Sequence, residues 1–429
     1  MSSTGVTSVE KNLPAGKPLA DVSTDPAGHP RAISLGEALN GSNNSLGLLR
    51  LILASIVIFD HAFPLGGFGR DPFWILTRDQ ASLGSLAVLG FFAISGYLIA
   101  KSGMNGDVVQ FMWRRTLRIF PAYWVVLLFT AFIVGPLIWI SDGHNFVDYF
   151  TFGPNGPFWY FTSNWTLNIG TYGIHDLLKE TTPYGREIGG SAFNGSIWTL
   201  IYEWNCYLII AVLVAFGVMK KARIIVPILA GFFFLMQIIS LTNPGAIPVF
   251  LPILADGYRV SFGMVFLFGS VLAVYSKQIP FDNRLGILSG LVFLISLRYG
   301  GFSTVGTLAG VYFVMYLGAR LPRQLHWIGA KNDYSYGIYI YGFLVQQITA
   351  YLGWYRLGYV PYVAIALILS FALAWVSWHL VEKRAMSLKD WGPGRGWRHW
   401  VDRERSWYAN RRRRSISADA HEAAQTPKD

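Results

Sequence analysis

The chain has 429 residues, of which 53% are hydrophobic, 16% aromatic and only 14% charged. Because soluble domains average about 25% charged residues, this composition excludes an ordinary soluble protein and places most of the chain in lipid. The single cysteine, Cys206, excludes an internal disulfide framework and a cysteine metal cluster, and we predict no metal site. The net charge of +11 does not indicate a nucleic-acid partner, because the basic residues lie between apolar segments and in the C-terminal tail.

Residues 1–45 are polar, rich in glycine, proline and serine, and lack a signal peptide, so we expect a disordered cytoplasmic tail. Ten apolar segments follow. Since a membrane helix needs about 20 apolar residues, fewer where helices pack together, we predict an all-α integral membrane protein with a transmembrane domain over 46–386. The predicted spans are 46–65, 83–100, 119–140, 196–217, 223–241, 259–276, 285–298, 302–319, 334–352 and 360–380.

The basic residues test this count, because lysine and arginine accumulate in cytoplasmic loops. Every second loop is basic, which predicts an even number of spans, about ten, with both termini in the cytoplasm. The basic positions are Lys101, Arg114, Arg115, Lys220, Lys221, Arg223, Lys277, Arg284, Arg320, Arg323, Lys331 and Lys383.

The first span contains two ionisable residues, Arg50 and His61, eleven positions apart. At about 100° per residue they lie on one helix face, roughly 16 Å apart along the axis. Ionisable groups at membrane depth are costly and normally face the bundle interior or a wet cavity, so this spacing indicates a site. His61 is our candidate general base, because imidazole titrates near neutral pH. The alternative is a packing histidine bonded to a neighbouring carbonyl.

The second and third spans carry two different signals. Ala93, Ser95 and Gly96 are small residues that allow another backbone to approach closely, which predicts a packing motif. At the start of the third span, Arg115 and Arg118 share a helix face and could grip phosphates. The cytoplasmic bias of basic residues explains Arg115 adequately and Arg118 less well.

The loop 141–195 lies on the opposite side from the basic loops and is rich in aromatic residues and glycine. It is either a lid or glycan-binding platform, or a floppy loop with interfacial aromatic anchors, and the sequence favours neither. The residues available to bind a sugar are Trp159, Trp165, Tyr172 and Trp198.

Glu203, in the fourth span, is the second buried ionisable group. It lies at about the depth of His61, so a carboxylate–imidazole pair is geometrically possible, with Glu203 orienting the ring. The alternative is a carboxylate bonded to tyrosine or tryptophan neighbours. After the last span, residues 387–429 read as a basic amphipathic cytoplasmic tail lying on anionic lipid headgroups.

Six motifs in order resemble the acyltransferase-3 family of integral membrane acyltransferases, over about residues 46–386. They are the Arg50-x10-His61 pair, FFAISGYL, RRTLRIFPAYW, SIWTLIYEWNCYL, SYGIYIY and LVEKRA. Many family members carry a histidine after the tyrosine-rich part of the ninth span, where this chain reads Tyr341-Gly342-Phe343-Leu344. We also expect no fused extracytoplasmic hydrolase domain.

The resemblance implies transfer of an acyl group, usually acetyl, from cytoplasmic acyl-CoA to a saccharide or glycan hydroxyl, in a bacterial inner membrane. It maps the essential histidine to His61, the acidic position to Glu203, and the arginines to Arg50, Arg115 and Arg118. Acyl-CoA would be a co-substrate, the glycan and membrane lipids the other partners. The rival interpretation is a proton-coupled transporter or flippase of a polysaccharide precursor, which would use His61 and Glu203 as a proton relay. It leaves the cytoplasmic arginines without a purpose.

Overall fold

The computed structural model describes residues 33–41, 43–243 and 245–408. In this part of the chain the regular elements are helices, and the one β-type pairing is an isolated bridge between Ser34 and Pro280. Eight of these helices are long and apolar enough to cross a membrane. The prediction of an all-α integral membrane protein is therefore confirmed.

Each of the ten predicted spans coincides with a long helix. Eight belong to the membrane-length segments, in which α9 and α15 are extended by the helical turns before them to Ser196–Ala215 and Phe302–Arg320. The other two, α14 and α16, have 17 residues each and are not among the eight. The ten helices are α2 (Leu46–Gly66), α4 (Leu83–Asn105), α5 (Val108–Phe129), α9 (Leu200–Ala215), α11 (Ile225–Thr242), α13 (Gly257–Val274), α14 (Asn283–Tyr299), α15 (Thr307–Arg320), α16 (Ser335–Tyr351) and α17 (Tyr359–Ser377).

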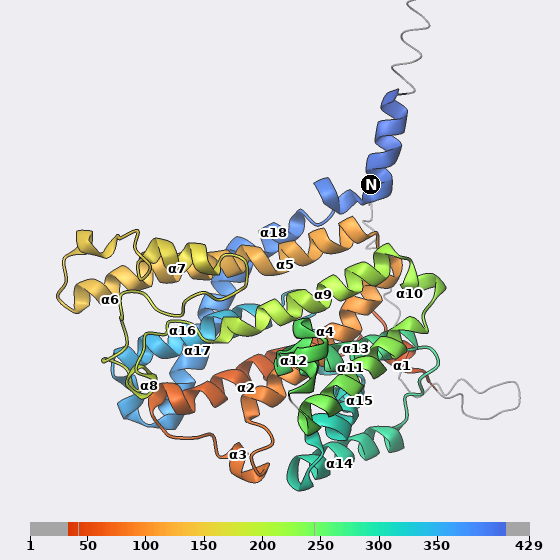
Figure 1. The fold of residues 1–429 in the computed structure, drawn as a ribbon, viewed down its shortest axis with the longest axis horizontal. Coiled ribbons are helices and arrows are strands. Elements are labelled where there is room, and N and C mark those ends of the chain that lie inside the picture. The colour runs from red at the N-terminus through yellow and green to blue at the C-terminus, as the bar shows by residue number, and fades with distance from the viewer. Residues whose placement is uncertain (1–32, 42, 244, 409–429) are drawn as a thin grey trace, which may run out of the picture.

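Short helices mark the two ends of the bundle. Those of the loop 141–195 gather at one end, the predicted outer end, and α1 and α10 lie at the opposite end, which the predicted topology places in the cytoplasm (Figure 1). The short elements that matter below are α1 (Leu35–Ala38), α6 (Gly135–Ser141), α7 (Pro157–Asn164), α8 (Pro183–Ile188), α10 (Val218–Lys221), η8 (Trp378–Glu382) and α18 (Lys383–Ser387).

The third span differs from its prediction at the cytoplasmic end. Helix α5 begins at Val108, where the Asp107 carboxylate accepts the first backbone N–H groups, and not at residue 119. A π-helical turn, η1 (Thr130–Val134), joins it to α6, so the continuous helical segment has 34 residues. Hydropathy marks where the apolar layer starts, whereas the helix itself continues past the arginines into the polar region.

The segment before the first span also differs from its prediction. Residues 33–41 and 43–45 are ordered, because Ser34 and Glu37 form a capping box at α1 and Leu35 and Leu39 are buried. The backbone N–H of Leu35 donates to the Ile279 carbonyl at 2.8 Å. The predicted disordered tail is therefore wrong for this stretch, and residues 1–32 lie outside the described part.

The small residues of the second span form a close contact with another helix in the bundle interior. A Cβ at Gly96 would lie 2.0 Å from the Phe266 carbonyl oxygen on α13, and one at Gly269 would lie 2.4 Å from the Ala93 oxygen. Glycine is therefore required on both helices where α4 and α13 cross, which confirms the predicted packing motif.

Replacing Gly96 with alanine should destabilise the protein by roughly 1–3 kcal/mol, because one helix must move away from the other. The measurement is the thermal unfolding midpoint of the purified protein in detergent. Gly231, on α11, is the matched control, since a Cβ there meets nothing within 4 Å. Because alanine favours a helix more than glycine does, Gly231→Ala should not destabilise the protein, and an equal loss there would show that the close contact at Gly96 does not set the requirement.

The loop 141–195 is a compact, ordered cap on the outer end. Tyr149, Tyr160 and Phe193 are fully buried in it, and the Asn164 side chain bonds the backbone of Gly170 and Thr171. The description of this loop as floppy is therefore wrong. Its buried aromatic residues belong to the same hydrophobic core as the helices of the bundle.

Candidate active site

Two of the predicted arginines meet on one carboxylate at the predicted cytoplasmic end of the bundle. Arg50, on α2, and Arg118, on α5, both donate to Asp333 Oδ2, Arg118 at 2.6 Å. The other Asp333 oxygen accepts from the Ser335 hydroxyl at 2.5 Å, just inside α16. Burial alone would raise the pKa of Asp333, but the two guanidinium groups overcome it and lower the pKa to about 2.

Asp333 therefore joins three helices at one point. Arg118 also lies 3.7 Å from Glu382, in η8 at the end of α17, whose carboxylate is buried. The two carboxylates neutralise Arg50 and Arg118 but do not use all their N–H groups, so these arginines retain donors for a further anion.

Arg115 lacks such a partner. Within the described part of the chain no carboxylate contacts it, and its Nε–H is buried without a hydrogen bond. Its guanidinium lies 6.0 Å from the ring centre of Tyr207 on α9. Arg50, Arg115 and Arg118 together form a cation cluster. Of these three arginines, Arg115 is the one that has no carboxylate in contact within the described residues.

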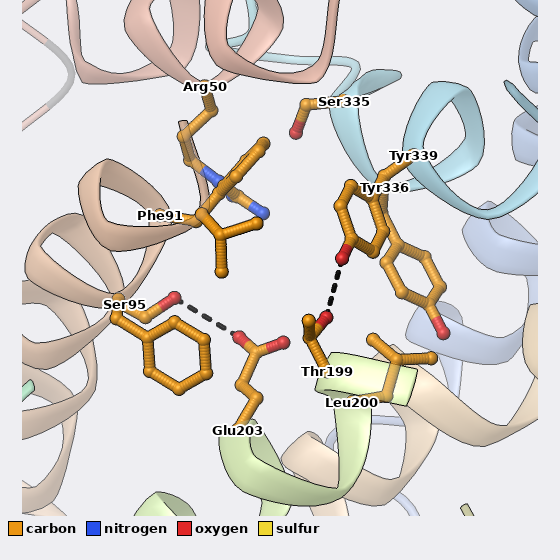
Figure 2. Close-up of a pocket in the computed structure, with 11 residues that line it drawn as sticks. Arg50, Phe91, Ser95, Thr199, Leu200, Glu203, Ser335, Tyr336 and Tyr339 are labelled. Atoms are coloured by element: carbon orange, nitrogen blue, oxygen red, sulfur yellow. Dashed lines mark hydrogen bonds between the residues drawn. The ribbon is translucent and has the colours of Figure 1, made fainter. Parts of the chain in front are cut away.

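Glu203 lies next to this cluster, inside the bundle. Its Oε1 accepts from the Tyr207 hydroxyl at 2.5 Å and from the Ser95 hydroxyl at 3.1 Å. Arg50 and Glu203 extend into the same cavity from opposite walls, as Figure 2 shows. The cavity is lined by Arg50, Val88, Phe91, Phe92, Ser95, Thr199, Leu200, Glu203, Ser335, Tyr336 and Tyr339.

His61 lies outside this cavity, nearer the outer end of α2. Its Nδ1 is buried without a hydrogen-bond partner, and its ring meets the edge of Phe343 on α16 at 5.3 Å between centres. The alternative of a packing histidine bonded to a neighbouring carbonyl through that atom is therefore not observed. Within the described part of the chain, this ring nitrogen has no hydrogen-bond partner.

The predicted contact between Glu203 and His61 is absent. Glu203 is instead bonded to Ser95 and Tyr207, which corresponds to the alternative of a carboxylate held by its aromatic neighbours. The two side chains lie at similar depths in the bundle, but depth does not determine which way a helix is rotated about its axis. The side chains therefore do not meet. The faces of α2 and α9 that carry them meet different neighbours.

Helix α16 connects the two halves of the site. Tyr339 shares a 2.5 Å hydrogen bond with Thr199 at the cavity wall, and Phe343, one turn further along α16, contacts His61. Phe343 is also met edge-on by Tyr184 of α8 in the outer cap, at 5.9 Å between ring centres. A row of α16 side chains thus runs from the cavity to the histidine and on to the cap.

The four predicted sugar-binding aromatics divide into two groups. Trp159, Trp165 and Tyr172 are 45%, 54% and 41% exposed on the outer cap, where a saccharide could reach them. Trp198 instead packs edge-on against Tyr202 and Tyr258. Its indole is engaged within the bundle, so the structure gives it a packing role.

Two residues of the site, Asp333 and Tyr207, were not predicted from the sequence. A signal existed for Asp333: it is an acid at the cytoplasmic start of the ninth span, on the side where three arginines were expected. Tyr207 follows Glu203 by four residues, so the two share a helix face, and its hydroxyl could have been assigned to that carboxylate.

These features define a class of protein, a helical membrane protein with several spans. Arginines and carboxylates meet at one end of its bundle, and the His61 imidazole lies toward the other end. Comparison with known proteins makes the class specific. An acyltransferase domain of the acyltransferase-3 family matches residues 43–186. Residues 43–186 of this chain are thus similar to the family that the motifs resemble.

Two curated relatives extend over nearly the whole bundle. An "O-acetyl transferase" of Shigella phage Sf6 is 28% identical over 80% of this chain and 96% of its own length. "Nodulation protein 10" of Rhizobium leguminosarum bv. viciae is 26% identical over 82% of this chain and 96% of its own length. No solved structure matches significantly.

Proposed function

We propose that this protein transfers an acyl group, acetyl as the first choice, from cytoplasmic acyl-CoA to a hydroxyl of an envelope or exported saccharide. The observation that carries the proposal is the placement of Arg50 and His61 on one helix, with the arginine in a cytoplasmic cation cluster and the imidazole beneath the outer cap. The relative named O-acetyl transferase supports acetyl and an oxygen acceptor. A bacterial inner membrane is the location that fits this reaction.

In this mechanism Arg115 binds the donor phosphates, because it is the arginine without a carboxylate in contact. Arg50 and Arg118, which Asp333 holds in place, contribute their remaining N–H groups. The thioester arm extends along α16 past the cavity toward His61. Glu203 lines that cavity, and its carboxylate accepts hydrogen bonds from Ser95 and Tyr207. In this mechanism Glu203 therefore helps to position the thioester arm and does not orient the imidazole.

In the chemical step, the His61 imidazole both accepts and returns the proton. The acceptor oxygen attacks the thioester carbonyl carbon while His61 takes the hydroxyl proton, and the imidazolium then returns that proton to the departing thiolate of CoA. An acyl-histidine intermediate is the less favoured route. The proton-relay transporter gains no support, because His61 and Glu203 are not joined by hydrogen bonds.

The direct test incubates membranes containing the protein with acetyl-CoA labelled in the acetyl group, together with a saccharide fraction from the same envelope. We expect label in saccharide that mild base releases as acetate, since the product is an O-ester. Label that remains on CoA in the presence of every saccharide fraction, with a folded protein, would contradict the proposal.

Replacing Arg115 with alanine should raise KM for acyl-CoA roughly tenfold or more with a small effect on kcat, because a charge-assisted contact to phosphate is lost. The measurement is initial-rate kinetics over a range of donor concentrations. Arg320→Ala, at an exposed cytoplasmic arginine, is the control and should leave KM unchanged. A loss of kcat alone for Arg115→Ala would place this arginine outside the donor site.

A further inference from the structure

The helix formed by residues 397–408 extends away from the bundle. In Figure 1 it is the dark blue segment that leaves the molecule beside the start of α5, across the direction of that helix. Its large aromatic side chains do not pack into the core: Trp397 is 62% exposed, Trp407 54% and Tyr408 58%. So much exposed aromatic surface on one short helix indicates a surface that is covered in the protein's working environment.

The order of residues makes this helix amphipathic. At about 100° per residue, five apolar residues fall within an arc of roughly 120°. The five are Trp397, Trp400, Val401, Trp407 and Tyr408.

Arginines border the apolar arc on both sides. Arg398 and Arg405 lie along one edge, and Arg403 lies along the other, with its guanidinium 5.5 Å from the ring centre of Trp400. Asp402 falls on the polar face, and Glu404 is the one acid within the arc. Aromatic rings flanked by arginines match the boundary between lipid tails and anionic headgroups, where the rings enter the lipid and the arginines reach the phosphates.

The segment before this helix is fixed to α5. The Trp113 indole donates to the Leu388 carbonyl at 2.9 Å, and the Gln110 side-chain amide donates to the Gly394 carbonyl at 2.8 Å. Gly396, at φ +84°, then turns the chain into the helix. These contacts lie on the same stretch of α5 as Arg115 and Arg118.

We propose that helix 397–408 docks on the anionic phospholipid headgroups of the cytoplasmic leaflet, and that residues 388–396 transmit this docking to the arginine end of α5. Charge complementarity selects this occupant, because the arc is bordered by cations and the predicted topology places it at the cytoplasmic membrane surface. The transmission step rests on the proposed function, since it is an effect on donor binding. Docking itself does not depend on that function.

Hydrogen exchange of the full-length protein in nanodiscs tests the docking. Amides of 397–408 should exchange roughly tenfold more slowly in phosphatidylglycerol-containing discs than in discs of phosphatidylcholine alone. The double variant Arg398→Glu/Arg405→Glu should lose this difference. Ser406→Glu, on the polar face, should keep it. Equal exchange in both lipids would overturn the docking, and so would protection that appears only on addition of soluble cytoplasmic protein.

Kinetics in the same discs test the transmission. KM for acyl-CoA should be roughly fivefold higher in discs without the anionic lipid, and Trp113→Phe should remove this difference while 397–408 stays protected. Identical KM values in both lipids would overturn the transmission alone. If no acyl transfer occurs in either lipid, the proposed function fails, and the exchange experiment still decides the docking.

Discussion

Replacing His61 with alanine should lower kcat for acyl transfer by roughly 10²–10⁴-fold, because the acceptor hydroxyl loses the group that takes its proton. Donor binding should change little, since the cytoplasmic cation cluster does not contact His61. The measurement is transfer of labelled acetyl to saccharide, together with direct binding of acetyl-CoA to the purified variant. A loss of transfer with donor binding intact is the signature of a catalytic base.

His144 provides the matched control for this experiment. It is an exposed histidine of the outer cap that stacks on Trp139, with ring centres 4.2 Å apart. His144→Ala should keep full activity. If His61→Ala retains wild-type kcat, the proton goes to another group and the proposed chemistry is wrong.

Replacing Asp333 with asparagine should destabilise the protein by roughly 3 kcal/mol, because two partly buried arginines then face each other without their shared carboxylate. The substitution keeps the side-chain oxygen that Ser335 donates to, so the start of α16 is spared. The measurement is the thermal unfolding midpoint in detergent. Because folding lowers the pKa of Asp333 to about 2, the wild-type contribution is intact above about pH 4 and is lost as pH falls toward 2.

Asp390, the exposed partner of Arg114 at 2.7 Å, is the control for this substitution. An exposed ion pair contributes little, so Asp390→Asn should leave the midpoint nearly unchanged. Free CoA should raise the midpoint of Asp333→Asn more than that of wild type, since its phosphates replace the missing anion. If CoA raises the unfolding midpoints of Asp333→Asn and of wild type equally, Arg50 and Arg118 do not belong to the donor site.

The membrane helices were predictable because their signal is local. Apolar length alone found the eight membrane-length segments of the described chain, and it also found α14 and α16, which have 17 residues each. The beginning of α5 was not predictable in the same way, since hydropathy reports the lipid boundary and Asp107 determines the helix end. Order in the segment around Leu35 depends on contacts with residues near Ile279, which no local pattern reveals.

Most individual residues of the candidate site were predictable from the sequence, but the contacts between residues on different helices were not. Helical spacing placed Arg50 and His61 on one face correctly, because a single helix fixes that relation. The pairing of Glu203 with His61 needed the rotation of α9 against α2, which the sequence does not specify. Asp333 was missed for the same reason: its importance comes from two arginines on other helices.

The outer cap is attached to the bundle through backbone carbonyls. Gln347 donates to the Ala192 carbonyl at 2.6 Å, and Asn194 donates to that of Ile340 at 2.7 Å. These bonds fix the base of the cap to α16, while Trp159 and Trp165 stand on its exposed rim. Mutation can therefore reshape the rim without disturbing the fixed base or the cation cluster. Under the proposed function, changes at the rim would therefore alter the acceptor preference and leave the donor site unchanged.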